Sequence, residues 1–379
     1  MKRLLPVLGA LVLVAAVIAV VVLQRPDTKA AVPPSGDVVL QYTDGTQLWR
    51  VGQPETPLVR QVAAELFAKA RMTLDQLRES GGAIVVTTID PKVQSAAAEA
   101  IRAVAAGQPA SLRYSLTAVD PNNGSIRAYA PGDDPAVDYA GGVLKEPGPA
   151  FFPFNVVAVL QAGKTLDVRE ALLKSDNAVM SDLVKDVGIK PVITAARQAG
   201  VPEAVDIDGK KAVLLVGEAG VAVGGSEARM RPLDLAASYA TFAAEGTRHD
   251  AHFVTHITNV NGETLYRAIR AAKPAFDVDP LRSKDIANQI TAALENDPVC
   301  GDRSWSSSST CRHGEWRPDG QEQVSHAWMV AYNPQISVAA FVGSDQASTP
   351  AVDREGRAVV GAALPKDLWT ALEEKMKRW

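Results

Sequence analysis

The sequence is poor in the residue types that hold metal ions, and it has no concentration of charge of one sign. Its 379 residues include two cysteines and five histidines, with 39 lysines and arginines against 43 aspartates and glutamates. Two cysteines without neighbouring histidines do not make a zinc site. The basic residues are scattered, without a stripe and without interleaved aromatic residues, which excludes a nucleic-acid-binding surface.

Three histidines lie close together in the sequence, at His249, His252 and His256. They fall at the start of a predicted strand, where residues four apart are separated by roughly 13 Å. This separation and the lack of a third convergent ligand favour exposed strand histidines over a zinc site. We expect no metal and no cofactor.

A long uncharged run follows the first three residues of the chain. Lys2 and Arg3 precede 20 uncharged residues, 4–23, which are rich in Leu, Val, Ala and Ile. As a helix this run spans roughly 30 Å, about one bilayer core. A cleaved signal peptide normally has a shorter apolar region of about 7 to 15 residues, and 28–30 is only a weak cleavage candidate. We predict a single-pass membrane anchor over 1–25 and an extracytoplasmic tether over 26–55.

The two cysteines, Cys300 and Cys311, bracket a serine-rich loop. In an oxidising compartment they would close this loop as a disulfide, which agrees with an exported chain. The alternative is a pair of free, partly buried thiols. Small polar residues between the two favour the disulfide.

The order of secondary-structure signals predicts an α+β fold. With 47% hydrophobic residues the chain is long enough for one large domain and a small appendage. Predicted antiparallel hairpins are separated by mostly helical blocks. This order is not the alternating βαβ order of a parallel sheet. The predicted hairpins are 115–129, 254–269 and 327–342, and the predicted helices are 57–78, 91–107, 155–163, 232–246, 283–296 with Ser283 as its cap, and 365–379.

Several motifs in order resemble penicillin-binding protein transpeptidases. They are TTIDPKVQ, AVDPNNGSIRAY, PGPAFFPF, Ser175-Asp176-Asn177, DVGIKPVITAARQAGV, RPLDLAASYATFAAEG and HAWMVAYNPQISVAAFVG. The resemblance covers 56–379, as an entry segment over 56–110 and a transpeptidase-like domain over 111–379. It implies a central antiparallel sheet between helical layers, the fold shared with serine β-lactamases. The stretch 37–56 is too short for the glycosyltransferase domain of class A relatives.

The octapeptide PGPAFFPF departs from the family's acylation motif, P-G-S-x-F-K-P-F, at both catalytic positions. Pro149 stands at the nucleophile, where it removes the hydroxyl and also a backbone N–H of the oxyanion hole. Phe152 stands at the Lys that shares the proton. Proline suits the first turn of a helix, so we expect the helix to form while acyl transfer is lost. Losing nucleophile and base together lowers the rate by about a millionfold.

The other two active-site motifs can each be interpreted in two ways. Ser175, Asp176 and Asn177 fit the S-x-N motif, but these residues also make good helix caps. Arg312, His313 and Gly314 are the nearest match to K-T-G, which would keep the cation and the glycine and lose the Thr hydroxyl. A basic loop beside Cys311 is the alternative.

No other nucleophile stands out in the sequence. No Ser or Thr has a Lys three residues later, and there is no G-x-S-x-G elbow. Ser309 has Arg312 at that spacing, and a guanidinium is no base at neutral pH.

The resemblance with a disabled centre predicts a membrane-anchored pseudo-transpeptidase of cell-wall synthesis. It would bind a peptidoglycan stem peptide or a cell-wall synthesis or division protein. The alternatives are an active transpeptidase or carboxypeptidase with a relocated nucleophile such as Ser175, and a reversible sensor of β-lactams or muropeptides.

Overall fold

A computed structural model describes residues 36–132, 134, 136–174, 176–207, 209–217, 219–295, 297, 299, 310–318 and 322–377 of the chain. The predicted anchor, Ser175 and Cys300 lie outside these residues. Among the helices that are described, none combines the length and apolar character that a membrane crossing needs.

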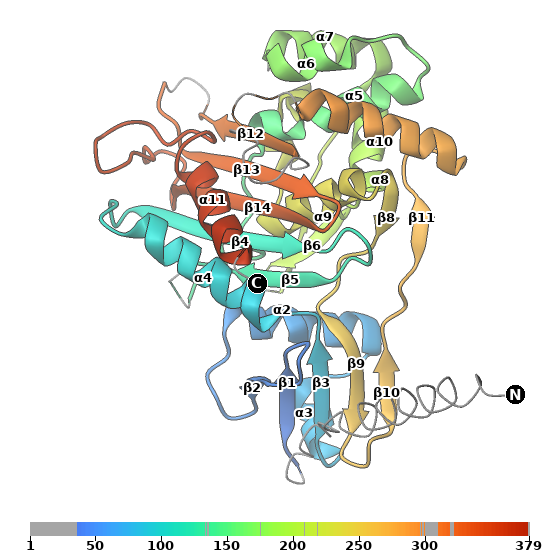
Figure 1. The fold of residues 1–379 in the computed structure, drawn as a ribbon, viewed down its shortest axis with the longest axis vertical. Helices are drawn as coiled ribbons and strands as arrows, with labels where there is room; N and C mark the ends of the chain where they lie inside the picture. Colours follow the sequence, from blue (N-terminus) through green and yellow to red (C-terminus); the bar gives the residue numbers. More distant parts are fainter. Residues whose placement is uncertain are drawn as a thin grey trace, which may run out of the picture.

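A five-stranded antiparallel sheet forms the centre of the molecule, in the order β12-β13-β14-β4-β5 (Figure 1). Its strands are β4 (Leu112–Val119), β5 (Ile126–Ala130), β12 (Thr310–Trp316), β13 (His326–Asn333) and β14 (Ile336–Ser344). Strands β13 and β14 pair from His326 with Gly343 to Asn333 with Ile336. The predicted hairpins 115–129 and 327–342 are therefore present, and β12 is left at one edge of the sheet.

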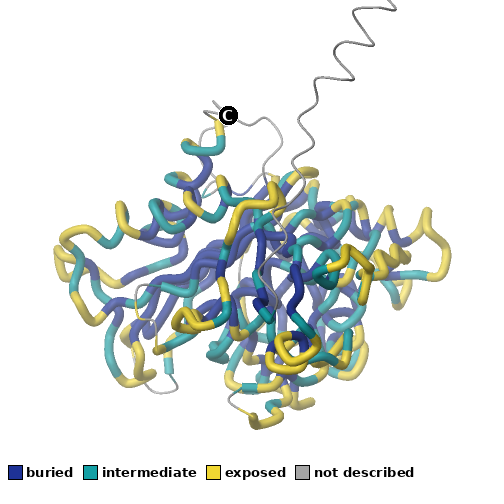
Figure 2. The backbone as a smooth tube through the Cα atoms, turned by 90° about the horizontal axis from the view of Figure 1, so that it is seen from below, coloured by how far each residue is buried: buried dark blue, intermediate teal, exposed yellow. Residues whose placement is uncertain are grey.

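Side chains alternate between the two faces of this sheet and build two separate cores. Met329, Val338 and Leu116 join one cluster with the helices α4 (Pro91–Ala105) and α11 (Leu364–Met376). Trp328, Val330 and Phe341 face the other way, into the larger core. Helices thus cover both faces, as the resemblance implied, and the strands between them are buried (Figure 2).

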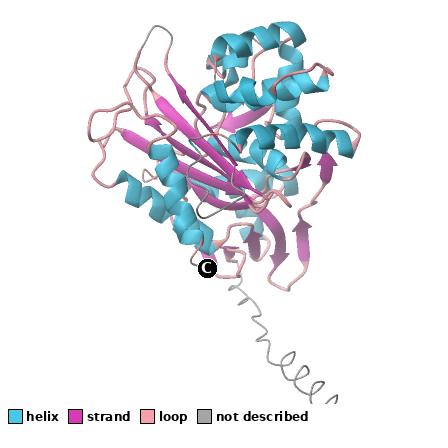
Figure 3. Cartoon of the chain, turned by 45° about the horizontal axis from the view of Figure 1, so that its top comes forward, coloured by secondary structure: helices cyan, strands magenta, loops and turns pink. Residues whose placement is uncertain are grey.

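The second face is covered by α9 (Pro232–Ala243), with α5 (Phe152–Gln161), α8 (Ile189–Ala199) and α10 (Pro280–Leu294) around it. The smaller helices α6 (Val168–Lys174) and α7 (Asn177–Val187) project at one end of the molecule (Figure 3). Helix α9 is buried along almost its whole length. Helix α5, predicted from the apolar run 155–163 as a helix in the middle of the domain, is buried from Phe152 to Val159.

A second sheet has the order β10-β9-β3-β1-β2 and lies below the central sheet in Figure 1. It is built from β1 (Val38–Gln41), β2 (Gln47–Arg50), β3 (Ala83–Thr87), β9 (Val254–Asn259) and β10 (Thr264–Arg267). Strands β1 and β3 run parallel, whereas the other pairs are antiparallel. Two two-stranded sheets, the hairpin of β6 (Ala204–Ile207) with β7 (Lys210–Val213) and the pair of β8 (Thr247–His249) with β11 (Ala272–Pro274), complete the strands described.

The structure divides the chain differently from the predicted domains. Residues 38–50, assigned to the tether over 26–55, form β1 and β2 of the second sheet. Helix α4, assigned to the entry segment over 56–110, packs on the central sheet with α11. Strands β9 and β10, assigned to 111–379, belong to the second sheet. Sequence order misled here because the chain enters the second sheet twice, at positions more than 160 residues apart.

Two predicted helices need correction. The helix over 57–78 is α2 (Pro57–Glu65), a π-helical turn at Leu66–Ala70, and then α3 (Leu74–Glu79). Arg71 adopts a left-handed conformation, and Thr73 caps α3 with Gln76 in a capping box. Helix α10 begins at Pro280 with Asp279 as its cap, so Ser283 is not the cap. Ser283 is buried inside the helix, and its hydroxyl accepts from the N–H groups of Ala275 and Phe276.

Candidate functional site

The octapeptide forms a 3₁₀ turn, η2 (Gly148–Phe151), that leads directly into α5. Pro149 lies in the first turn, where its missing N–H needs no partner. Gly148 has a positive φ of 53°, and a Cβ there would come within 2.5 Å of the Glu315 carbonyl oxygen. Only glycine fits this position. Phe152 is completely buried and packs in the larger core.

Arg312, on the edge strand β12, lies directly against this motif. Its Nε donates to the Pro149 carbonyl at 3.1 Å, and its Nη1 donates to the Leu172 carbonyl at 2.7 Å. The guanidinium carbon lies 5.5 Å from the centre of the Phe152 ring, in cation–π geometry. The Arg312 side chain is only 1% exposed. The guanidinium is thus enclosed by the motif and held away from solvent.

The structure brings the first and third motifs together. Gly314, two residues beyond Arg312, lies so close to η2 that a Cβ would be 2.8 Å from both Ala150 N and the Pro147 oxygen. Residues 312–314 belong to a seven-residue strand, so the alternative of a basic loop is wrong. Arg312 therefore occupies the place at which the resemblance puts the cation of the third motif.

His313 turns toward Asp297, with 3.9 Å between its Nε2 and the carboxylate. Burial lowers the pKa of His313 below its usual 6.5, so the imidazole is neutral at pH 7. It supplies neither a charge nor the hydroxyl that the family's Thr would supply at this position. Burial also lowers the pKa of Arg312 below its usual value.

The second motif is split between two roles. Asp176 is the cap of α7, and its carboxylate accepts from the N–H groups of Ala178 and Val179 at 2.7 and 3.4 Å. Asn177 begins the helix, is exposed, and lines a cavity beside Pro149. The capping interpretation therefore fits Asp176, and Asn177 stays available to a ligand.

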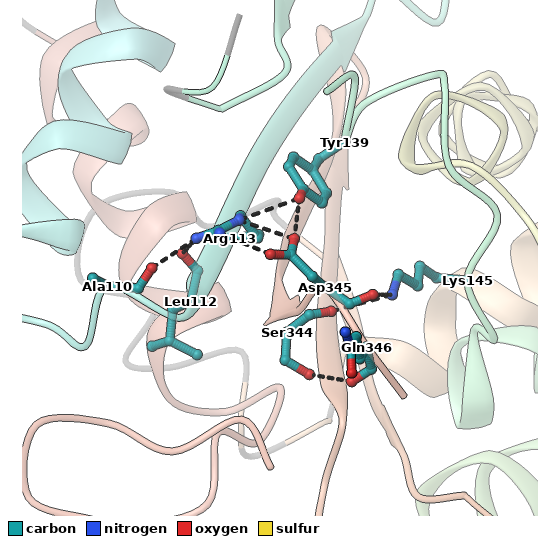
Figure 4. Close-up of polar contacts among 8 residues, drawn as sticks. All are labelled: Ala110, Leu112, Arg113, Tyr139, Lys145, Ser344, Asp345 and Gln346. Atoms are coloured by element: carbon teal, nitrogen blue, oxygen red, sulfur yellow. Dashed lines mark hydrogen bonds and ion pairs between the residues drawn. The ribbon is translucent and has the colours of Figure 1, made fainter. Parts of the chain in front are cut away.

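The segment before the octapeptide is held on several sides. The Lys145 ammonium donates to the carbonyls of Ser344 and Asp345, and the Asp345 carboxylate pairs with Arg113 at 2.7 Å (Figure 4). The Tyr139 hydroxyl donates to the same carboxylate, and burial together with this hydrogen bond raises the pKa of Tyr139 to about 12.

The rings of His326 and Trp328 both hold the backbone of Glu146, the residue after Lys145. His326 Nε2 and Trp328 Nε1 donate to the Glu146 carbonyl at 2.8 and 2.9 Å. Burial lowers the pKa of His326 to about 3, so it acts as a neutral donor. These bonds fix the position of the chain at Pro147.

A cavity of about 530 Å³ remains beside Pro149. It lies between η2, the first turn of α7, the loop that contains Gly220 to Glu227, and the end of β12. Its lining residues are Gly148, Pro149, Asn177, Gly220, Val223, Gly225, Ser226, Glu227, Glu315, Trp316 and Arg317. Phe152 is not among them. The phenyl ring fills the core behind the motif and leaves the groove open.

Sequence reasoning missed most of this lining. Glu227 and Ser226 lie in a loop that carries no motif of the resemblance, and Glu315 and Trp316 follow the third motif. A usable signal was the density of glycines at 217, 220, 224 and 225. Gly224 packs so tightly on the motif that a Cβ would lie 2.2 Å from the Gly148 oxygen. Such glycines mark close backbone approaches at a site.

The hydroxyl groups near the motif are not activated. Tyr239 donates to the Ala150 carbonyl at 2.8 Å, and burial raises its pKa well above 10.0. Ser226 lines the groove, but among the described residues no hydrogen bond links its Oγ to a base. A weak nucleophile needs such a base. The described part of the groove therefore has no assembled nucleophile.

Cys311 is disulfide-bonded, while its predicted partner Cys300 lies outside the described residues. Among the residues described, no group of three or more His, Cys, Asp and Glu side chains is arranged to hold a metal ion. His249 ends β8 and His256 lies within β9. His252 lies between these two strands and forms an isolated bridge with Ser125.

The family model for the penicillin-binding protein transpeptidase domain matches residues 137–298. Together with the fold, this match shows that the chain carries a penicillin-binding protein transpeptidase domain. Penicillin-binding protein 1A of Mycobacterium tuberculosis is 30% identical over 360 residues, covering 84% of this chain and 42% of that protein. The protein of the same name from Mycolicibacterium smegmatis is 31% identical, covering 84% and 44%. The chain thus spans less than half the length of these curated relatives.

Solved structures agree with this assignment. The structure of the penicillin-binding protein PonA1 from Mycobacterium tuberculosis matches with a TM-score of 0.73 at 29% identity, covering 84% of this chain and 89% of that one. The crystal structure of PBPA from the same organism matches with a TM-score of 0.69 at 18% identity, covering 91% and 100%. At that identity the second match supports the fold alone. The family takes part in peptidoglycan synthesis.

Proposed function

We propose that this chain is a membrane-anchored, extracytoplasmic pseudo-transpeptidase that binds a peptide of the cell wall without acylating it. The observation that carries the proposal is the packing of Arg312 on Phe152 and Pro149. An acylating site needs a hydroxyl, a base and free N–H donors at one point. Here Pro149 supplies neither the hydroxyl nor its N–H donor, the Phe152 ring replaces the base, and the Arg312 guanidinium beside them is enclosed.

The open groove favours peptide binding over a purely protein-binding surface. Phe152 is buried behind the motif, so a cavity of about 530 Å³ persists beside Pro149. This volume lies in the range of ordinary ligand sites, about 300–1,000 Å³.

Labelling with a fluorescent penicillin tests the proposal. The full chain is incubated with the probe, boiled in detergent and separated on a gel, beside the transpeptidase domain of an active relative as positive control. We expect a covalent band from the relative and none from this chain. A boil-resistant band from this chain, confirmed as an added mass on the intact protein, contradicts the proposal.

The variant Pro149→Ser sharpens the test. It restores the hydroxyl, but Phe152 and the guanidinium of Arg312 cannot take its proton at neutral pH. We expect no covalent band from this variant either. A band would show that another base serves the site.

A further inference from the structure

Three large aliphatic side chains in one stretch of the chain are almost completely exposed. Ile269 is 91% exposed, Val278 is 97% exposed and Leu281 is 76% exposed. The other exposed large hydrophobic side chains among the described residues range from 36% to 59%. Single, half-exposed aliphatic residues are ordinary on a protein surface, whereas large ones gathered in one place mark a contact surface. This stretch is therefore a candidate for an interaction.

The three side chains come from connected elements. Ile269 follows the end of β10 by two residues, and Val278 and Leu281 lie on either side of Pro280, where α10 begins. Between them, all three residues of β11 are exposed. Strands β10 and β11 follow one another along one side of the molecule, with α10 above them (Figure 1). The apolar side chains thus share one edge of the fold.

Cations accompany these apolar side chains. The chain from the start of β10 to the end of β11 carries Arg267, Arg270 and Lys273, all exposed, and no acidic residue. Within the described residues, none of the three has a carboxylate at ion-pair distance. Closer to α10, Asp277 is in an ion pair and Asp279 caps the helix. The positive charge is therefore concentrated beside Ile269.

This surface lies within reach of the predicted membrane anchor. Twelve residues, 24–35, separate the uncharged run 4–23 from Gly36, and fully extended they span about 40 Å at most. Gly36 leads into β1, and β10 lies three strands away in the same sheet, roughly 14 Å from β1. An anchor over 4–23 would therefore keep this edge of the second sheet within a tether's length of the bilayer.

A bilayer that contains anionic lipid offers partners for both kinds of side chain. Aliphatic groups leave water when they enter the boundary between headgroups and acyl chains, and lysine or arginine beside them meets the lipid phosphates. A tether raises the effective concentration of the surface, so a small contact area is enough. The unpaired cations around the aliphatic groups favour this partner over an apolar protein surface.

We propose that this edge lies against the extracytoplasmic surface of the membrane and binds anionic lipid. Its edge patch consists of Ile269, Val278 and Leu281, which enter the acyl-chain boundary, and of Arg270 and Lys273, which bind headgroup phosphates. The inference rests on the membrane anchor of the proposed function and adds a second contact between the protein and the bilayer. This contact fixes which side of the domain faces the membrane.

A fluorescent label within the edge patch measures the contact. Ala271→Cys adds an exposed thiol beside Ile269 and leaves the side chains of the patch in place. Arg102→Cys on α4, which packs on the opposite face of the central sheet from α10, carries the control label. The two natural cysteines are present in both labelled chains and give a common background.

Each labelled full chain is reconstituted into vesicles of phosphatidylcholine and phosphatidylglycerol, with or without bromine atoms on the acyl chains. Bromine quenches only a label that lies at the bilayer. We expect bromination to quench the label at 271 about twofold or more and to leave the label at 102 unchanged.

Two double variants test the assigned side chains. Ile269→Asp with Val278→Asp places charges on the apolar contacts, and Arg270→Glu with Lys273→Glu reverses the cations. We expect each pair to abolish the quenching of the label in the patch. Val216→Asp, at a side chain that is 55% exposed and lies outside the patch, is the matched control and should keep the quenching. Melting temperatures equal to that of the parent chain exclude a folding defect.

Quenching at 271 that is no greater than at 102 overturns the inference and leaves the proposed function standing. Quenching that persists in both double variants, or that is equal in vesicles of phosphatidylcholine alone, also overturns it. So does a change of fluorescence on reconstitution that bromination does not alter, because a second protein then covers the patch. Release of the chain from the vesicles by alkaline carbonate contradicts the membrane anchor and is a failure of the proposed function itself.

Discussion

Arg312, which the resemblance matches to the cation of the third motif, is buried in the core of this chain. A buried guanidinium needs partners for its N–H groups, and here they include the carbonyls of Pro149 and Leu172 and, at 3.9 Å, the Asp297 carboxylate. The Phe152 ring covers the flat face of the guanidinium. A compact ammonium group has no such flat face to stack on the ring. The two substitutions in the octapeptide and the arginine therefore form one packed unit.

We predict that Arg312→Ala lowers the free energy of unfolding by about 3–5 kcal/mol. The change leaves two buried carbonyls without donors and a cavity above Phe152. Arg317→Ala, whose side chain is 44% exposed, should stay within about 0.5 kcal/mol. Urea titrations followed by tryptophan fluorescence measure both. A loss below 1 kcal/mol for Arg312→Ala would show that the guanidinium is not a structural element.

At the scale of elements, local sequence patterns predicted where helices form more reliably than the residues at which they begin and end. The proline and aspartate before α4 and α10 begin both helices, because Asp90 and Asp279 accept from the first N–H groups. Ser283 offered the same chemistry one turn later, yet its hydroxyl accepts from the backbone N–H groups of Ala275 and Phe276, directly after β11. From the sequence, Ser283 could cap a helix or bind the backbone of another segment, and only the tertiary contact decides between these roles.

Helix α11 has a titratable group that makes its packing depend on pH. Glu373 is buried against the cluster shared with α4, and within the described part of the chain its Oε1 has no hydrogen-bond partner. Burial raises the pKa of Glu373 from 4.5 to about 8, while Lys377 opposes this change and Glu374 adds to it. The fold therefore favours the protonated form of the Glu373 carboxyl. An ion pair between Lys375 and Glu99 also joins α11 to α4.

We predict that stability falls as pH rises from about 4.5 to about 8, since the unfolded chain releases this proton near pH 4.5 and the folded chain near pH 8. Glu373→Gln should flatten this dependence and add about 2 kcal/mol at pH 8, allowing for partial solvation. The exposed neighbour change Glu374→Gln should leave the slope as it is. Urea unfolding at several pH values measures the slope, and an unchanged slope in Glu373→Gln contradicts the assignment.

At the scale of the whole molecule, the two sheets are joined where the chain crosses between them. Glu65, at the end of α2, accepts from the N–H groups of Phe253 and Val254 at 2.7 and 3.0 Å, where β9 begins. The Thr88 hydroxyl lies within 2.9 Å of the carbonyls of Ile126 and His252. These contacts connect segments far apart in the sequence and couple the second sheet to the central one.

We predict that Glu65→Ala lowers the free energy of unfolding by about 2–4 kcal/mol, because two N–H groups at the crossing lose their acceptor. The loosened crossing should also broaden thermal unfolding, with the second sheet melting first. Glu55→Ala, an exposed change just before α2, serves as control. Hydrogen exchange of β3 and β9 provides the readout, and unaltered protection in those strands would contradict the coupling.

The sequence by itself determined the α+β class, most helices and hairpins, and the presence of a proline and a phenylalanine, side chains without a hydroxyl or a base, at positions 149 and 152. These depend on local patterns and on residue chemistry, which are readable along the chain. Tertiary structure alone decided that residues 38–50 belong to a sheet with β3 and β9, and that Arg312 packs on Phe152. It also decided that the groove stays open with Glu227 in its wall. Each of these depends on contacts between segments distant in sequence, whose distances no local pattern encodes.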